Sequence, residues 1–223
     1  MKLGKGKRRS PQTQYEKVTS RLRLSRLICL IQVESGCMVD RVSALEGHYT
    51  PGRFGSAGDV GVTLTEVRDL TLHQVAAWPE TIGEVGGQIA ELLGAKSAPG
   101  PCSSCTNAAG SILRIEPLKW WVFGAEAPEV SDEMGATLDI SHSRTHLRIS
   151  GPKAAVLVNR VLPLDLRADA FGVGAVASSA LHHVGVTLWH TEKGYELFIP
   201  RGFAVAVWEI ITETAAQFGA EVI

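Results

Sequence analysis

The segment 138–167 holds many of the side chains in this chain that could do chemistry. Asp139, Ser141, His142 and His146 fall within eight residues of one another. Asp, Ser and His are the groups of a nucleophilic triad, and two histidines four residues apart on a helix can bind one zinc ion. Both chemistries require the groups to converge, so the secondary structure of this segment decides whether either is possible.

Residues 138–150 alternate in character, are rich in Ile and Thr, and end at Ser-Gly-Pro, which predicts one long strand. On a strand, His142 and His146 lie about 13 Å apart at ~3.3 Å per residue, so one ion does not reach both. Asp139 and Ser141 would share one face while His142 takes the other. The pattern therefore argues against a zinc site and a hydrolase, and predicts that these side chains support the scaffold.

Three other groups of residues have chemical potential. His182 and His183 are adjacent, so on a strand they point to opposite faces. Asp165 stands in the turn LPLDLR, where capping or pairing with an arginine is expected. Cys102 and Cys105 form a C-x-x-C in a loop, but a zinc ribbon needs a second such pair. We therefore expect no catalytic, cofactor-binding or metal-binding residue in this chain.

Known nucleotide-binding motifs are missing from the sequence. No G-x-G-x-x-G follows an expected strand, and the sequence contains no G-x-x-x-x-G-K-[ST]. Direct binding of FAD, NAD or ATP by this chain therefore has no support.

The hydrophobic periodicity predicts a mixture of helices and short strands. In the first part we expect strands at 60–67 and 72–78, a helix from 80 or 81 to 93, a loop at 95–110 and a hairpin of 111–118 with 119–124. After 138–150 we expect a helix at 152–161, strands at 175–181, 184–190 and 195–199, and a helix at 203–218. This order indicates an α+β fold of two ferredoxin-like halves, with mixed and antiparallel sheets around one core.

The final helix has an apolar stripe wider than a narrow seam. An ordinary core helix explains such a stripe, and a surface for a partner is the alternative. Because Trp and Arg are enriched at interface hot spots, the candidate partner interface is Arg144, Arg201 and Trp208.

Charge divides the chain unevenly. Residues 1–26 contain nine Lys or Arg and one acid, which leaves 13 basic and 22 acidic residues in the remainder. We expect residues 1–42 to be a basic disordered leader, of which 1–37 lie upstream of a true start at Met38, and 43–223 to be a single domain. A transit peptide is the alternative for the leader.

Composition restricts the partners and the compartment. The net charge of −1 does not suggest nucleic acid, and no run of 18 apolar residues predicts a membrane span. The four cysteines do not form a disulfide framework in a chain of this size, so we expect a cytoplasmic protein.

Four ordered pieces of the chain resemble the gamma subunit of heterotetrameric sarcosine oxidase. The ordered set makes the resemblance specific, and it covers about residues 43–219. The pieces are TPGRFG at 50–55, GVTLTEVRDLTLHQVAAWP at 61–79, LDISHSRTHLRISGPKAAVLVNRVLPLDL at 138–166 and GVTLWHTEKGYELFIPRGFAVAVWE at 185–209.

The resemblance implies a subunit of an oxidoreductase that acts on CH–NH donors and demethylates sarcosine to glycine, with tetrahydrofolate as the one-carbon acceptor. Its partners would be the alpha, beta and delta subunits, on which the family carries FAD, FMN, NAD, tetrahydrofolate and zinc. The gamma chain is regarded as non-catalytic, and its fold is similar to the folate-binding domain of the glycine-cleavage aminomethyltransferase.

Two alternatives stay open. The chain could be the gamma-type subunit of a related N-methyl amine oxidase, because this subunit alone does not define the amine. It could also be a free-standing folate-binding protein of the same fold, although the K-G-C-[YF]-x-G-[QE] loop of the relatives that assist iron–sulfur enzymes is missing.

Overall fold

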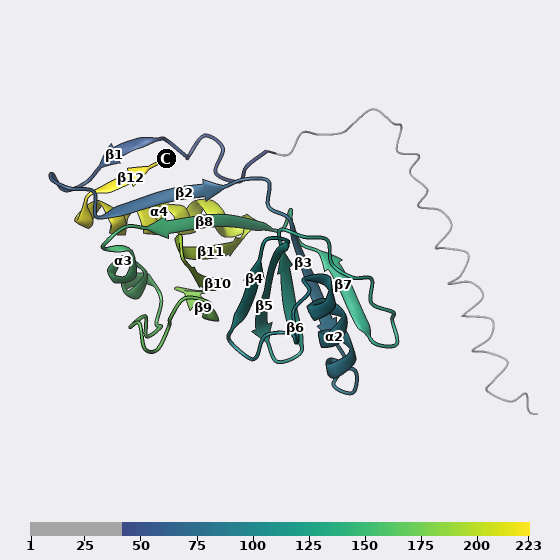
Figure 1. Cartoon of the computed structure of the whole chain (residues 1–223). Helices are drawn as coiled ribbons and strands as arrows, with labels where there is room; N and C mark the ends of the chain where they lie inside the picture. The colour runs from purple at the N-terminus through teal and green to yellow at the C-terminus, as the bar shows by residue number, and fades with distance from the viewer. Residues whose placement is uncertain (1–41) are drawn as a thin grey trace, which may run out of the picture. The chain divides into compact units, whose positions relative to one another are not determined.

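Two β-sheets divide the strands between them (Figure 1). The structure is a computed structural model that describes residues 42–223. The larger sheet contains β1 (Gly52–Phe54), β2 (Val62–Val67), β8 (Arg144–Ser150), β9 (Val176–Leu181), β10 (Val184–Thr191), β11 (Gly194–Pro200) and β12 (Ala220–Val222). The smaller sheet contains β3 (Leu72–Ala77), β4 (Ser104–Asn107), β5 (Gly110–Glu116), β6 (Lys119–Phe123) and β7 (Gly135–Asp139).

The strand orders are β1-β12-β2-β8-β11-β10-β9 and β4-β5-β6-β3-β7. β12 and β2 run parallel, whereas every other pair of neighbouring strands in the described part of the chain is antiparallel. In residues 42–223 the α-helices are α2 (Ile82–Leu92), α3 (Ala154–Val161) and α4 (Ala204–Ala215). The predicted α+β class with mixed and antiparallel sheets is confirmed: the larger sheet is mixed and the smaller one is antiparallel.

The prediction of one long strand at 138–150 is wrong. β7 and β8 belong to different sheets, and a turn joins them. The backbone N–H of Ser141 donates to Asp139 Oδ1 at 2.8 Å, and the backbone N–H of Ser143 donates to the carbonyl of Ile140 at 2.9 Å. Short polar side chains that bond to nearby backbone favour turns over strands, and here they break the alternating pattern.

One further detail was not predicted from the sequence, and another differs from the prediction. β2 joins the larger sheet between β12 and β8, so β2 and β3 lie in different sheets although they are close in sequence. β4 lies inside the segment 95–110, which was expected to be a loop, and pairs with β5 as an edge strand. Polar strand sequences such as SCTN give little periodic signal, because neither face is fully buried.

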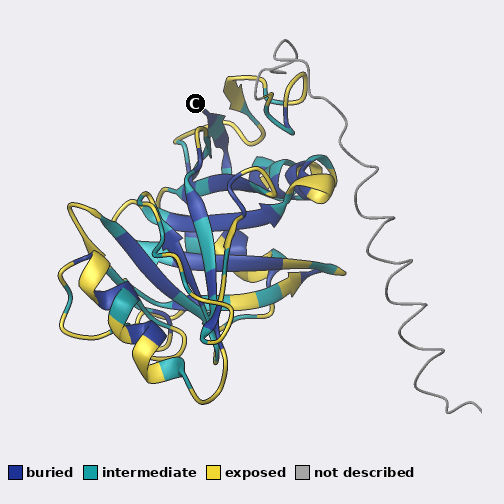
Figure 2. Cartoon of the chain, turned by 90° about the vertical axis from the view of Figure 1, so that its right-hand side faces the viewer, coloured by how far each residue is buried: buried dark blue, intermediate teal, exposed yellow. Residues whose placement is uncertain are grey.

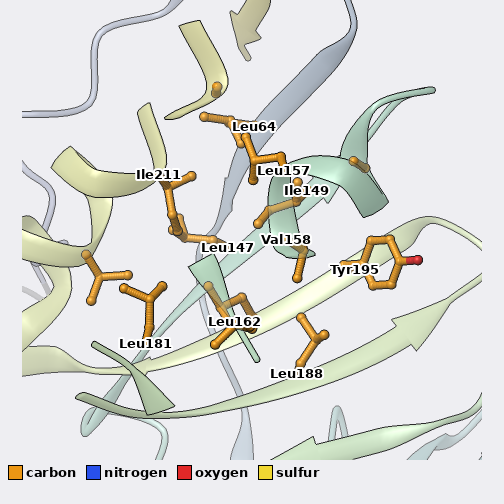
Figure 3. Close-up of a cluster of buried hydrophobic side chains, with 14 of the residues drawn as sticks. Leu64, Leu147, Ile149, Leu157, Val158, Leu162, Leu181, Leu188, Tyr195 and Ile211 are labelled. Atoms are coloured by element: carbon orange, nitrogen blue, oxygen red, sulfur yellow. The ribbon is translucent and has the colours of Figure 1, made fainter. Parts of the chain in front are cut away.

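The larger sheet packs α3 and α4 against one of its faces. Figure 3 shows the side chains of this cluster: Leu157 from α3 and Ile211 from α4 lie near Leu147 and Ile149 of β8, and all four are buried. In the smaller sheet, α2 covers one face through a second cluster that includes Ile89 and Trp120. Exposed residues gather on the loops and on the outer sides of helices (Figure 2).

A third cluster joins the two sheets. It unites Leu72, Leu113 and Trp121 of the smaller sheet with Trp189 and Phe198 of the larger one. Because strand side chains alternate between faces, Leu147 and Ile149 of β8 point to the helices. The alternate residues Arg144, His146 and Arg148 point toward the smaller sheet, and these form the site described next.

Candidate functional site

Three basic-type side chains form a row on β8, on the face that meets the smaller sheet. The row consists of Arg144, His146 and Arg148, at every second position of the strand. Their partners across the β8–β11 pair are Pro200, Phe198 and Glu196, respectively. The two sheets bury the centre of the row and leave a cleft at each end.

His146 occupies the sealed centre of the row. Its side chain is 0% exposed, and Nε2 lies 2.7 Å from Oε2 of Glu196, whose side chain is 3% exposed. The imidazole stacks on Phe198 at 4.5 Å between ring centroids and meets the edge of Phe123 at 5.5 Å. Since a carboxylate only accepts, Nε2 carries the proton; Nδ1 has no hydrogen-bond partner among the described residues.

Glu196 also binds the outer end of the row. Arg148 Nε donates to Glu196 Oε1 at 2.7 Å, and Thr191 Oγ1 donates to the same oxygen at 3.3 Å. Burial raises the pKa of Glu196, but the hydrogen bonds and charges of His146 and Arg148 outweigh burial, and the net pKa lies below its ordinary value. Glu196 is therefore a carboxylate at neutral pH.

A cleft of about 540 Å³ opens beside Arg148, and we call it the Arg148 cleft. Its walls include the aromatic rings of Phe123 and Trp189, and its charged groups are Arg148, Lys193, Glu192 and Glu196. The indole of Trp189 is fixed, because Nε1 donates to Ser104 Oγ at 2.8 Å. The cleft therefore combines two aromatic rings with two cations and two carboxylates, a lining typical of a small-molecule site.

A second cleft of about 320 Å³ opens at the other end of the row, and we call it the Arg144 cleft. The guanidinium carbon of Arg144 lies 5.6 Å from the centre of the Trp121 ring. Burial lowers the pKa of Arg144 from its ordinary value. Among residues 42–223, no carboxylate forms an ion pair with Arg144.

The structure separates the groups that a triad would need. Asp139 ends β7 and caps the turn through the backbone of Ser141, and hydrogen bonds from Ser141 lower the pKa of the Asp139 carboxyl. Ser141 Oγ accepts from the backbone N–H of Leu72 at 2.9 Å. His142 is exposed in the turn, whereas His146 is buried in β8. The sequence predicts that His142 and His146 lie apart along one strand. In the structure they lie apart because His142 is in the turn and His146 is in β8.

The remaining candidates for chemistry also lie apart. His182 and His183 form the exposed turn between β9 and β10 and do not lie on a strand. Cys102 is exposed and Cys105 lies in β4, and both are free thiols. Within residues 42–223, no group of three or more His, Cys, Asp or Glu side chains is arranged to hold a metal ion.

The expected pairing of Asp165 with an arginine is present in the structure. Arg167 Nη2 lies 2.5 Å from Asp165 Oδ2, and Arg167 Nε lies 2.9 Å from Oδ1. The side-chain hydrogen bond from Arg167 lowers the pKa of Asp165 to about 2. The pair therefore stabilises the turn after α3 on the surface.

The three candidate interface residues have different environments. Arg201 is exposed directly after β11, and Arg144 lines the Arg144 cleft. Trp208 is 4% exposed, packs on Tyr49 at 5.3 Å between ring centroids and donates from Nε1 to the carbonyl of His48 at 3.2 Å. Trp208 thus presents little surface to another chain, and the apolar stripe of α4 is mostly core.

Sequence reasoning missed Glu196 and Arg148, the best-connected charged residues of the site. The available signal was an acid inside the apolar strand sequence GYELFIP, because a charge on a buried strand needs a partner. The alternation of Arg144, His146 and Arg148 was a second signal. Sequence spacing gives no indication of the partner, since Glu196 lies 50 residues after His146.

No helix in residues 42–223 is long and apolar enough to cross a membrane. The expected leader at 1–42 precedes the expected domain at 43–223. Residues 1–41 lie outside the part of the chain that the structure describes, so this division stays a prediction.

Comparison with curated proteins gives one consistent group of relatives. The chain is 29% identical to the sarcosine oxidase subunit gamma of Corynebacterium sp. (strain U-96), over 65% of this chain and 74% of that protein. It is 30% identical to the subunit gamma of Corynebacterium sp. (strain P-1), over 50% of this chain and 59% of that protein. It is 32% identical to the subunit gamma of Arthrobacter sp., where it spans 45% of that protein.

Solved structures and family models agree with these relatives. A chain of the heterotetrameric sarcosine oxidase from Corynebacterium sp. U-96 matches with a TM-score of 0.63 and 25% identity, over 74% of this chain and 88% of that chain. Aminomethyltransferase T of the glycine cleavage system from Bartonella henselae matches in fold, with a TM-score of 0.50 and 13% identity over 74% of this chain and 48% of that chain. The model of the GCVT N-terminal domain matches residues 84–223. The chain therefore belongs to the GCVT N-terminal domain family, and within that fold it is similar to sarcosine oxidase gamma subunits.

Proposed function

We propose that this chain is the gamma-type subunit of a heterotetrameric sarcosine oxidase and that it contributes no reacting group. The observation that carries the proposal is the match to a chain of a heterotetrameric sarcosine oxidase over 88% of that chain's length. The resemblance to three gamma subunits supports the same assignment. In this role the chain supports oxidation of sarcosine to glycine by its partners.

The arrangement of ionisable groups supports a non-catalytic role. A general base must reach the proton that it removes. His146 is sealed between the sheets, and its partner Glu196 is already bound by Arg148. Asp139 is committed to a turn. His146, Arg148 and Glu196 thus bind one another across the neighbouring strands β8 and β11 of the larger sheet, and their hydrogen bonds are used within the fold.

Under this proposal the cofactors belong to the partners. FAD, FMN, NAD, tetrahydrofolate and zinc are placed on the alpha, beta and delta subunits, and the complex is cytoplasmic. The expected interface of this chain includes Arg144 and Arg201.

Two preparations of the tagged chain test the proposal. Expressed alone, the chain is expected to show no flavin absorbance and no sarcosine-dependent peroxide. Co-expressed with its partner subunits, it is expected to retain a yellow complex that oxidises sarcosine. Peroxide formation by the purified single chain would rule out the non-catalytic assignment. A version starting at Met38 is expected to assemble as well, and its failure would show that residues 1–37 are needed.

The identity of the amine substrate is the most specific part of the proposal. If the chain serves a related N-methyl amine oxidase, the co-purified complex oxidises another amine faster than sarcosine. Steady-state rates of the complex with sarcosine and with other N-methyl amines distinguish these two cases.

A free-standing folate-binding protein is the second candidate, and the Arg148 cleft favours it. The cleft volume lies in the range of small-molecule sites, about 300–1,000 Å³. Trp189 and Phe123 could stack on the pteridine ring of a folate, and Arg148 and Lys193 could bind the carboxylates of its glutamate tail. Titration with tetrahydrofolate while the fluorescence of the tryptophans is followed tests this role. Quenching that Arg148→Ala removes would favour this candidate, and unchanged fluorescence would favour the subunit role.

A further inference from the structure

The two ends of the β8 row differ in how their arginines are neutralised. Arg148 is held by the buried carboxylate of Glu196 at 2.7 Å. Arg144, four residues earlier on the same face, has no carboxylate within ion-pair distance in the described part of the chain. Its Nη1 donates only to neighbouring backbone and hydroxyl oxygens of Ser143, at 3.2 and 3.4 Å. One half-buried positive charge therefore remains uncompensated.

The Arg144 cleft holds polar groups that could surround an acidic side chain. Ser178 and Thr187 of the larger sheet line it, and their hydroxyl oxygens lie 3.3 Å apart. The carboxylate of Glu116 also borders the cleft, but Lys119 Nζ binds it at 2.7 Å. The ring of Trp121 forms the floor under Arg144 and holds the guanidinium in place.

Arg201 extends the positive charge onto the surface. Pro200 pairs with Arg144 across the β8–β11 ladder, and the backbone N–H of Arg201 donates to the carbonyl of Ser143 at 2.9 Å. The Arg201 Nη2 atom donates to the carbonyl of Val42 at 2.5 Å. Like Arg144, Arg201 forms no ion pair within residues 42–223.

Apolar residues lie beside Arg201. Phe203, in the same turn as Arg201, is 54% exposed, and Val42 is 48% exposed. We call the set of Val42, Arg144, Arg201 and Phe203 the Arg144–Arg201 surface. An aromatic residue beside arginines is the composition that interface centres prefer.

We propose that the Arg144–Arg201 surface binds an acidic segment of a partner subunit, with one carboxylate of that segment in the Arg144 cleft. The proposal rests on the proposed function for the existence of such a partner. Arginine forks bind carboxylates through two parallel hydrogen bonds, which gives the contact direction as well as charge.

Charge argues against residues 1–26 of this chain as the occupant. Residues 1–26 carry nine basic side chains against one acid, so they would be repelled by the two arginines. The rest of the chain has nine more acids than bases. Arg144 and Arg201 form no ion pair with an acid of residues 42–223. We therefore expect their carboxylate partner to come from another polypeptide.

Co-purification of the complex tests the proposal. The tagged chain is co-expressed with the partner subunits, and flavin absorbance per tagged chain is measured at low and at high salt. The double variant Arg144→Glu, Arg201→Glu is expected to recover at least about tenfold less flavoprotein, and Arg144→Lys an intermediate amount. Lys96→Glu makes the charge change of one of these two substitutions on an exposed residue elsewhere and is expected to behave as the wild type. Circular dichroism checks that each variant is folded.

A second measurement uses the isolated full chain and a poly-glutamate peptide. The peptide is expected to shift the amide resonances of Arg144 and Arg201, and the double variant is expected to lose these shifts. If the wild type recovers no flavoprotein but binds the peptide through both arginines, the proposed function is wrong. The proposal that the Arg144–Arg201 surface binds an acidic segment is then still supported. Two results together would overturn the surface: no peptide binding by the wild type, and equal flavoprotein recovery, including none, by the double variant and the wild type. Equally tight binding of free glutarate would overturn the polypeptide assignment.

Discussion

Glu196 and His146 are bound to each other at 2.7 Å in the interior of the protein, between the two β-sheets. Fifty residues separate them in the sequence, and the β8–β11 ladder brings them to adjacent strands. Arg148 binds the other carboxylate oxygen. This three-residue network is the charged connection between the centre of the molecule and the Arg148 cleft.

Removal of the Glu196 charge is expected to destabilise the chain strongly. Glu196→Gln keeps the shape but leaves Arg148 and His146 without a buried carboxylate, which should cost about 2–3 kcal/mol of unfolding free energy. Urea denaturation followed by tryptophan fluorescence measures the change. The matched control, Glu192→Gln, alters an exposed neighbour and should change the unfolding free energy by less than about 0.5 kcal/mol. Equal stability of Glu196→Gln and wild type would show that the network does not stabilise the fold.

The pH dependence of stability should report the same network. The pKa of Glu196 is lower in the folded than in the unfolded chain, so its contribution is present above the unfolded pKa of about 4.3. The contribution is then lost as the pH falls through the folded pKa. The stability difference between wild type and Glu196→Gln should therefore be constant near pH 7 and shrink below about pH 4. A difference that grows on acidification would mean that the folded pKa is raised.

The surface pair of Asp165 and Arg167 gives an independent electrostatic test. NMR titration of the Asp165 carboxyl carbon should give a pKa of about 2 in the wild type. In Arg167→Gln the value should rise toward about 3.9, the value of an isolated aspartate, because the largest cause of the lowering is removed. An unchanged pKa in that variant would show that the pair does not persist in solution.

Gly135 at the start of β7 should be intolerant of any side chain. A Cβ there would lie 2.0 Å from the carbonyl oxygen of Ala76 on β3, and backbone is expensive to move. Gly135→Ala should lower the unfolding free energy by about 1–3 kcal/mol. The control is Gly87→Ala, in the exposed middle of α2 with open space around it, which should raise stability by up to about 1 kcal/mol. Thermal unfolding of both variants decides, and a tolerated Gly135→Ala would contradict the β3–β7 pairing.

Long periodic elements could be predicted from the sequence, and pairings between distant strands could not. The patterns gave α2, α4 and the strands β9 to β11 within a few residues, because each buries one regular face. β1 and β12 have three residues each and depend on their pairing with one another, so they carry no periodic signal of their own.

The site shows the same limit. The sequence predicts one strand through Asp139, Ser141 and Ser143, but β7 ends at Asp139. The Asp139 carboxylate accepts from the backbone N–H of Ser141, and Ser143 Oγ donates to the carbonyl of Ile140, so the chain turns there. The alternation from Arg144 to Arg148 was visible as a polar face. The sequence does not show that Arg148 is paired with a carboxylate while Arg144 is not. That difference depends on Glu196 of β11, which reaches Arg148 only when the sheet is folded.

The most direct test of the central claim is to purify the tagged chain alone and together with its partner subunits, and to measure flavin absorbance and sarcosine-dependent peroxide in both. The account predicts a colourless, inactive single chain and a yellow complex that oxidises sarcosine. A single chain that binds flavin and oxidises sarcosine by itself would contradict it, as would a chain that recovers no flavoprotein.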